Sequence, residues 1–430
     1  MSEKKSPYIT YFIIVVAALG YFVDIYDLIL FNVVKKESLE AIMQGATPEV
    51  LKSTGIFLFN MQMFGMLLGG LLWGIWGDKK GRLSVLFGSI LLYSVANVVN
   101  AFVTTIPMYA VVRVIAGIGL AGELGAGITL VTETMSKEKR GYGTMIIVSF
   151  GALGAVAAAL VGANGQAIGN FLTSIFNISF ANWQVAYILG GVMGLVLLLL
   201  RVGTIESGMF KNIQQTDVSR GDIRMLFNNK ERFLKYLNCI LIGLPIWYFI
   251  GLIVANSELI WAKELNVQGK VVNGTALMYA YIGLSVGDVF SGLISQILKS
   301  RRKVVFLYLG LSAVLTCYYL FLANGISLQG FYFLSFLVGC ATGFWAIFVT
   351  IAAEQFGTNI RSTVTTTVPN FVRGSVPIIT MLFQFLTVQL SGNVISAFIV
   401  GVLCIGLSFW ATWRAKETFS KDLDYTEQYP

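Results

Sequence analysis

Long apolar runs separated by short polar breaks recur along the whole chain. Each run is close to the roughly 20 residues that an α-helix needs to cross the bilayer core, so the pattern predicts an all-α membrane protein with twelve transmembrane helices. The longest polar break, 203–232, separates a first half (1–202) from a second half (233–430), and we interpret it as the linker between them. The predicted spans are 8–34, 53–77, 82–104, 107–132, 141–169, 183–202, 233–256, 273–297, 303–323, 328–353, 362–388 and 393–414.

Composition supports this class and excludes several functions. Hydrophobic residues make up 56% of the 430 residues and charged residues 12%, with a mean hydropathy of +0.75, whereas a soluble domain typically carries about 25% charged residues. The opening "MSEKK" leads straight into an apolar run, so no cleavable signal peptide is predicted. Histidine is absent and the four cysteines form no CxxC pair. We therefore expect no metal, no cofactor and no enzymatic activity, and proton chemistry must use carboxylates.

Basic residues gather on one side of the predicted spans. Most of the 30 Lys and Arg lie in the two terminal segments, the linker and the loops on their side of the membrane. The positive-inside rule then puts both termini in the cytoplasm. We interpret the net charge of +8 as this topology signal, so no nucleic acid is expected as a partner. The compact loops fit a bacterial inner membrane, and we expect a monomer in the lipid bilayer. The opposite side carries only Lys35, Lys36, Lys52, Lys263 and Lys270.

The two halves repeat each other at an offset of about 220 residues, a sign of an internal duplication. "TLVTETMSKEKRGYG" places Glu133 seven residues before Arg140, and "TIAAEQFGTNIRST" places Glu354 seven residues before Arg361. Each glutamate ends a span on the cytoplasmic side and each arginine opens the next. A looser echo links "GIWGDKKGR" (74–82) with "GLISQILKSRRK" (292–303). Two six-helix halves joined by a cytoplasmic linker are typical of parallel repeats in transporters.

Three motifs make the chain resemble the major facilitator superfamily along nearly its whole length. The stretch from Gly74 to Arg82 matches that family's GxxxD(R/K)xG(R/K) loop, "RVIAGIGLAG" (113–122) matches its RxxxGxG pattern, and "KET" (416–418) is a weaker third match. The resemblance implies the major facilitator fold and a cytoplasmic gate that holds the halves together while the outside is open. Asp78 is expected to meet basic residues and the N-terminus of span five or eleven. The predicted gate residues are Asp78, Arg82, Glu133, Arg140, Glu354 and Arg361.

Six ionisable groups lie within predicted spans, where each costs at least about 2.5–3.5 kcal/mol at mid-bilayer and is a functional candidate by default. At about 1.5 Å per residue, Asp27 and Arg113 fall at the same depth, so we expect them to pair and Asp27 to stay ionised. Asp24 has no evident partner, and with Glu123 it is the better candidate to carry a proton. The six groups are Asp24, Asp27, Glu123, Asp288, Arg113 and Arg373.

Arg373 in span eleven and Asp288 in span eight also fall at similar depth. They are expected either to pair or to act as a substrate anchor with its counter-ion. Span eleven is expected to bend at "TVPNFVRGSVP" (367–377), which carries Asn370 between two prolines. Further candidate substrate-binding residues are Trp247, Tyr248 and Gln166.

Beyond the superfamily, the chain resembles its proton-symporting branches. "DIYDLILFNVV" is similar to the DxYDL opening of phosphate:proton symporters and the DGxD opening of aromatic-acid:proton symporters, and "GIGLAGE" is similar to their GxGxGG(D/E) run. The resemblance implies that Asp24, Asp27, Arg113 and Glu123 couple protons. Gly251 stands where the phosphate group has an acid four residues after the tryptophan, which argues against phosphate. No glutamine- and asparagine-rich sugar site is found in span seven.

These features favour a proton-coupled symporter of a small anionic metabolite, such as a monocarboxylate or an aromatic acid, working by alternating access. One alternative is a proton-antiporting exporter of cationic or amphipathic compounds, in which the intramembrane acids bind the cation. Another is a receptor or sensor that does not transport. The position of Arg373 distinguishes the first two, because a basic group in the central cavity disfavours cations.

Overall fold

The computed structural model describes residues 7–136, 140–176, 179–201 and 219–428. The side chains of residues 7–10, 48, 49, 52, 140, 163, 164, 166, 172, 173, 175 and 176 are not described. The helices are α1 (Pro7–Ile42), α2 (Pro48–Lys80), α3 (Arg82–Asn100), α4 (Ile106–Leu120), α5 (Glu123–Thr134), α6 (Arg140–Phe176), α7 (Asn182–Leu200), η2 (Ile223–Leu226), α9 (Lys230–Trp247), η3 (Tyr248–Ile253), η4 (Val254–Asn256), η5 (Ser257–Trp261), α10 (Ala262–Glu264), α11 (Asn273–Leu298), α12 (Arg301–Cys317), η6 (Tyr318–Leu322), α13 (Leu328–Thr342), α14 (Trp345–Gln355), α15 (Arg361–Gly374), α16 (Val376–Leu390) and α17 (Asn393–Arg414).

Within the described residues, twelve helical segments are long and apolar enough to cross a membrane, which confirms the number predicted from the sequence. Most boundaries agree within a few residues. Span one continues to Ile42, and span seven runs from Lys230 to Glu264. The predicted linker at 203–232 falls largely outside the described residues, and its last part already belongs to η2 and α9.

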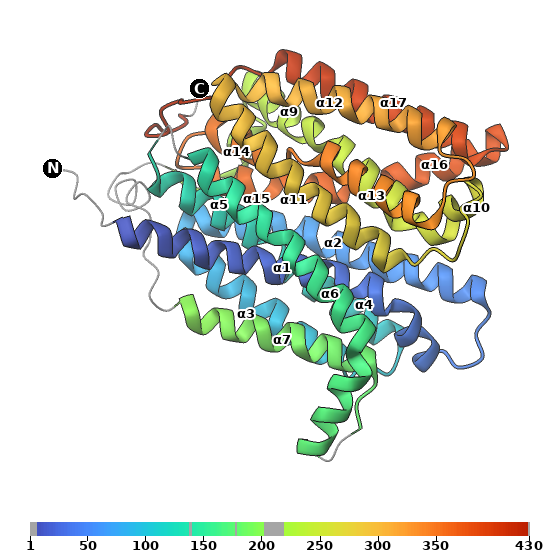
Figure 1. The fold of residues 1–430 in the computed structure, drawn as a ribbon. Coiled ribbons are helices and arrows are strands. Elements are labelled where there is room, and N and C mark those ends of the chain that lie inside the picture. The colour runs from blue at the N-terminus through green and yellow to red at the C-terminus, as the bar shows by residue number, and fades with distance from the viewer. Residues whose placement is uncertain (1–6, 137–139, 177–178, 202–218, 429–430) are drawn as a thin grey trace.

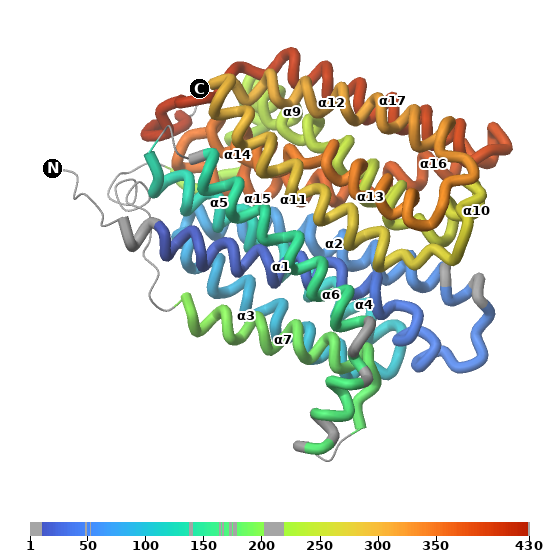
Figure 2. The backbone as a smooth tube through the Cα atoms, viewed as in Figure 1, coloured from blue at the N-terminus to red at the C-terminus, as the bar shows by residue number. Residues whose placement is uncertain are grey.

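The long helices run along a common axis, and α1 begins at the same end of the bundle at which α17 finishes (Figure 1). We call this the termini end. Helices of the first 200 residues, blue to green, gather on one side, and those after residue 219, yellow to red, gather on the other (Figure 2). The interface between the two sets therefore runs the length of the bundle.

Local sequence signals explain where several helices begin. The hydroxyl of Thr105 accepts from the backbone N–H of Met108 at the start of α4, and that of Ser327 accepts from Gly330 at the start of α13. Asn229 caps α9 in the same way through Glu231. Such caps satisfy N–H groups that have no partner within the helix.

Spans four and ten are each interrupted near their middle, at positions related by the repeat. Span four breaks between α4 and α5, and span ten between α13 and α14. Span seven loses regular geometry after Pro245, where η3, η4 and η5 replace the α-helix. Span eleven divides at Ser375, between α15 and α16, within the stretch where a bend was expected. These breaks turn helix ends and free polar groups toward the interior, as in other transporters.

Glycines allow the broken spans to pack closely on their neighbours. A Cβ at Gly117 of α4 would collide with the carbonyl oxygen of Gln62 in α2, and one at Gly339 of α13 would collide with that of Ala280 in α11. The two contacts occupy corresponding places in the two halves. Small residues at such crossings let helix backbones approach each other.

Candidate functional site

Three neighbouring cavities, which share lining residues, lie between the two sets of helices. The largest, about 420 Å³, is at the end of the bundle opposite the termini. It shares Asn32, Phe59, Gly251 and Ala255 with a second cavity of about 10 Å³. The second shares Trp247, Ile250 and Tyr281 with a third of similar size, which Arg373 lines together with Tyr21, Ile25, Ile246, Leu284 and Trp345. Each small cavity has room for about one water molecule, so the path is narrow in this conformation.

Arg373 reaches the central cavity from α15. Its guanidinium carbon lies 5.4 Å from the ring centre of Trp345 and 6.0 Å from that of Trp247. A terminal N–H group donates to Asn370 at 3.4 Å. Asn370 in turn donates to the carbonyl oxygens of Ala121, at the break in span four, and of Thr366. Arg373 is thus held by aromatic faces and an amide, inside the protein rather than against lipid.

Asp24 is the ionic partner of Arg373. One carboxylate oxygen lies 3.9 Å from the guanidinium, and both side chains are buried. Neither oxygen has a hydrogen-bond partner within the described part of the chain. The expectation that Asp24 lacks a partner is therefore wrong. The pair joins span one of the first half to span eleven of the second.

Asp288 has a different role from the one predicted. Its carboxylate accepts the backbone N–H of Ala346 at 2.9 Å, in the first turn of α14. The predicted pairing with Arg373 is wrong, because Asp288 caps the half-helix that the break in span ten creates. A negative charge is favourable at a helix N-terminus.

Asp27 and Arg113 are both buried within the first half but do not make the predicted contact. The guanidinium of Arg113 donates to the side-chain oxygen of Gln62 and lies 4.3 Å from the ring centre of Phe31. Both carboxylate oxygens of Asp27 lack a hydrogen-bond partner among the described residues. A carboxylate oxygen of Asp27 points at Gly190 of α7, 2.5 Å from where a Cβ would stand. Equal depth in the membrane was therefore not enough to predict a contact between Asp27 and Arg113.

Glu123 is not an isolated carboxyl either. It forms a buried ion pair with Arg201, at the C-terminal end of α7. The guanidinium of Arg201 donates to both carboxylate oxygens of Glu123, at 3.0 Å to Oε2. Sequence reasoning did not select Arg201. Because Glu123 opens α5, the pair stabilises the break in span four. Glu123, which the sequence named with Asp24 as a better proton candidate than Asp27, is therefore ion-paired within the first half.

The three remaining candidates have different outcomes. Trp247 lines the second and third cavities, as expected of a binding residue. Tyr248 turns away, and its hydroxyl donates to the carbonyl oxygen of Ala397 in α17. The side chain of Gln166 lies outside those described. Sequence reasoning did not select Tyr21 or Tyr281, because nothing in the local sequence shows which tyrosines face the centre.

At the termini end, Asp78 ties the first half to the start of α15. Its carboxylate accepts the backbone N–H groups of Ser362 at 3.0 Å and Thr363 at 2.8 Å, and the Thr363 hydroxyl at 2.7 Å. Arg82 lies 3.5 Å away. This confirms the expected contact with a basic residue and a helix N-terminus, and identifies the helix as that of span eleven.

Glu133 sits between two arginines of different halves. It is 2.8 Å from Arg82 and 3.0 Å from Arg361, so it joins the two halves as expected of a gate residue. Its repeat counterpart Glu354 lies 3.3 Å from Arg301. Arg301 was not selected from the sequence, although the repeat offset from Arg82 points to it. The predicted gate residue Arg140 has a side chain outside those described.

The segment after α17 folds back onto the same region. The guanidinium of Arg361 donates to the carbonyl oxygen of Leu423 at 2.6 Å. Asn359 and Glu427 exchange hydrogen bonds at 2.9 and 3.0 Å, and Glu427 lies 3.1 Å from Arg232. The termini end is therefore closed by contacts between both halves and this segment.

Twelve spans, two broken helices facing a central cavity and a sealed end define a polytopic membrane transporter of small molecules. A family model described as Major Facilitator Superfamily matches residues 12–381. The chain belongs to the Major Facilitator Superfamily, and it is a transporter rather than an enzyme.

Similar proteins point to the same family. A Bacillus subtilis (strain 168) protein named as a niacin/nicotinamide transporter is 26% identical over 86% of this chain and 87% of its own length. The 3-(3-hydroxy-phenyl)propionate transporter of Escherichia coli (strain K12) is 26% identical over 71% of each chain. The benzoate transport protein of Acinetobacter baylyi is 22% identical over 82% of this chain and 78% of its own. The solved structure of the proton:xylose symporter XylE, 16% identical, matches with a TM-score of 0.73 over 97% of this chain and 98% of that one, and it shows the shared fold.

Proposed function

We propose that this transporter is a proton-coupled symporter of small planar carboxylates, working by alternating access. The observation that carries the proposal is the position of Arg373 in the central cavity, beside Trp247 and Trp345. A guanidinium binds a carboxylate through two parallel hydrogen bonds, and aromatic walls suit a flat ring. The names of the relatives, which include transporters of benzoate and niacin, are consistent with this class.

The Asp24–Arg373 pair provides a means of coupling. A substrate carboxylate that binds Arg373 competes with the Asp24 carboxylate for the same guanidinium. Two carboxylates facing one arginine in a buried site repel each other, so the arrangement favours protonation of one of them. Protonation of Asp24 would release Arg373 for the substrate, and proton and anion would then cross together.

Asp27 is the second proton candidate. It is buried, and its carboxylate lies near the Asn97 amide but forms no ion pair within 4.0 Å among the described residues. An unpaired carboxylate inside a membrane is costly, so the neutral form is favoured. The sequence had predicted Asp27 as the ionised partner of Arg113; without that contact, we count Asp27 as a proton candidate beside Asp24. Glu123, paired with Arg201, is the weaker candidate for proton transfer.

The closed termini end supports an alternating-access cycle. The basic loops favour a cytoplasmic position for this end, so the conformation described here would face outward. Inward opening would break the Asp78 contacts with α15 and the Glu133–Arg361 pair. A cation exporter is disfavoured, because Arg373 adds a positive charge where a cation would bind.

The test is uptake of labelled benzoate and nicotinate into proteoliposomes. An inside-alkaline gradient of about one pH unit is worth about 1.4 kcal/mol per proton, and we expect it to raise the initial uptake rate several-fold. Because the protonated acids also cross bilayers passively, the rate is measured relative to protein-free liposomes and to Arg373→Met. A protein-dependent rate that is indifferent to the gradient, or no protein-dependent rate for either acid, would refute the proposal.

A further inference from the structure

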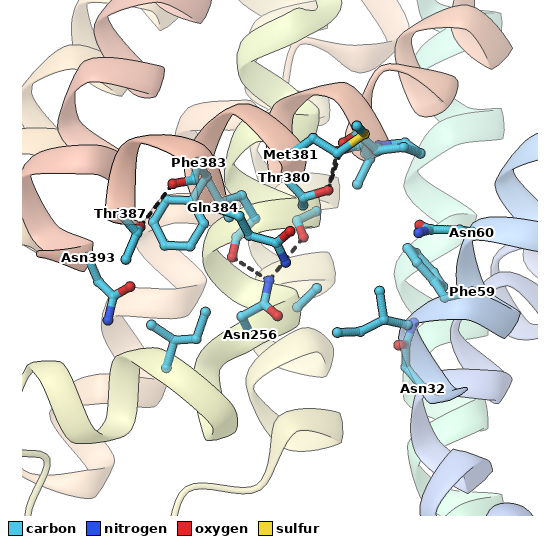
Figure 3. A pocket seen from close by; sticks show the side chains of 18 of the residues that line it. Asn32, Phe59, Asn60, Asn256, Thr380, Met381, Phe383, Gln384, Thr387 and Asn393 are labelled. Atoms are coloured by element: carbon cyan, nitrogen blue, oxygen red, sulfur yellow. Dashed lines mark hydrogen bonds between the residues drawn. The ribbon is translucent and has the colours of Figure 1, made fainter. Parts of the chain in front are cut away.

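The large cavity opposite the termini end is a compartment of its own, outside the central site. It lies between the outer parts of α1 and α2 on one wall and η3, η4, η5 and α16 on the other. Asn32, Phe59 and Asn60 face Thr380 and Gln384 across it (Figure 3). Its volume of about 420 Å³ is within the range of small-molecule sites. We call this cavity the vestibule.

Lys35 is the one charged side chain among the described residues that line the vestibule. No carboxylate of the described chain forms an ion pair with it within 4.0 Å, and its stem packs along Gly55 of α2. The carboxylate of Glu258 attracts the Lys35 ammonium from beyond ion-pair distance. That carboxylate also accepts the backbone N–H of Asn273. A single ammonium without a close counter-ion inside a concave surface attracts anions.

Amide side chains also line the vestibule. Asn256 donates to the carbonyl oxygen of Leu252, which leaves its own oxygen available, and Asn393 donates to Glu264. Asn32, Asn60 and Gln384 make no hydrogen bond with the described part of the chain. The vestibule therefore offers amide donors and one cation, a combination that suits a carboxylate with a small polar or aromatic body.

We propose that the vestibule is a second binding site for the transported carboxylate, with Lys35 as its anchor and the free amides as hydrogen-bond donors. This inference rests on the proposed function, because it names the same substrate class. The vestibule floor at Phe59 and Gly251 is also the roof of the next cavity toward Arg373. A carboxylate that enters from this end meets Lys35 first and Arg373 second. The vestibule raises the local substrate concentration and so the rate of entry.

Kinetics of benzoate uptake test the site, with a matched control in the neighbouring residue. Lys36 carries the same charge but is exposed and does not line the vestibule. We expect Lys35→Met to raise KM about five- to tenfold with Vmax within about twofold, because capture weakens while the central step is unchanged. Lys36→Met keeps the wild-type KM, and Lys35→Arg recovers most of the affinity.

Equilibrium binding separates this inference from the proposed function. Arg373→Met should retain weak benzoate binding at the vestibule, and the double variant Lys35→Met/Arg373→Met should lose it. If Lys35→Met behaves as wild type and Arg373→Met has no residual binding, the vestibule site is refuted and the central anchor stands. If Lys35→Met lowers binding while Arg373→Met does not, the vestibule stands and the central anchor is refuted. Equal effects of Lys35→Met and Lys36→Met refute the site in favour of general surface charge.

Discussion

Replacing Arg373 with methionine removes the guanidinium but keeps a long apolar side chain beside Trp247 and Trp345. The change affects both the stability of the protein and its affinity for the substrate. It leaves the buried Asp24 carboxylate without its ionic partner, 3.9 Å away in the wild type. It also removes the donor that we propose for the substrate. A second substitution, Asp24→Asn, separates the two effects.

The stability effect follows from the burial of both groups. At 3.9 Å and an effective dielectric constant near 20, the Coulomb attraction is about 4 kcal/mol before desolvation. Removing one partner of a buried pair typically costs about 3–5 kcal/mol. We therefore expect Arg373→Met to unfold at a clearly lower temperature. The double variant Asp24→Asn/Arg373→Met should recover most of the loss, because no unpaired charge remains.

The binding effect should not recover with the stability. A hydrogen bond to a charged group is worth about 1.5–3 kcal/mol, so carboxylate affinity should fall about 10- to 150-fold in both the single and the double variant. Asp24→Asn alone should bind benzoate at least as tightly as wild type and with less dependence on pH, because Arg373 is already free. Wild-type binding should instead strengthen on acidification.

The assay is thermal unfolding of the purified variants, followed by tryptophan fluorescence, together with benzoate binding at two pH values. The matched control is Lys303→Met, which likewise replaces a cationic side chain by methionine. Lys303 is on α12, away from the lining of the central cavity. Wild-type affinity in the double variant would refute the anchor. An unchanged unfolding temperature in Arg373→Met would refute the ionic pairing with Asp24.

Three further perturbations test other parts of the structure. Asp27→Asn should weaken the stimulation of uptake by a proton gradient, because Asp24 can still carry a proton, and should keep benzoate exchange between the two sides; gradient-driven uptake at the wild-type rate would contradict its role as second proton carrier. Asp78→Asn weakens three hydrogen bonds at the start of α15, worth about 1.5–3 kcal/mol each when charge-assisted, and should shift the population toward inward-open, measured as faster labelling of a cysteine introduced at Thr366; unchanged labelling would argue against the gate. Hydrogen bonds from Ser300 and backbone N–H groups outweigh the desolvation of Glu417 and lower its pKa, so its stabilising effect is present above the unfolded-state pKa and lost as pH falls through the folded one. Glu417→Gln should therefore unfold at a lower temperature than wild type near neutral pH, with a difference that shrinks in acid, and a difference independent of pH would contradict this.

Local sequence was sufficient for the contacts at the termini end. Asp78, Glu133 and Arg361 stand at helix ends, where the chain must turn, and the duplicated Glu–Arg spacing places equivalent groups on the same membrane face. At these positions the side chains of the two halves face each other. The Glu133–Arg361 pair and the contact of Asp78 with a helix N-terminus were therefore predictable, whereas the structure decided between spans five and eleven.

The pairing of charges in the middle of the membrane was not predictable in the same way. Asp27 and Arg113 share a depth, yet they point to Gly190 and Gln62. From one residue of a helix to the next, the position along the axis changes by only about 1.5 Å, but the direction in which the side chain points rotates by about 100°. An error of one residue in helix phase therefore turns a side chain from one neighbour to another.

The sequence by itself determined the number of spans, because insertion into a bilayer depends on the apolar length of each segment. It also determined which ionisable residues lie in the membrane. Only the tertiary structure decided that Asp24 faces Arg373, that Asp288 caps a half-helix and that Glu123 meets Arg201. Those contacts depend on how each helix is rotated against its neighbours and where spans four and ten break. Both are set by packing among segments far apart in the chain.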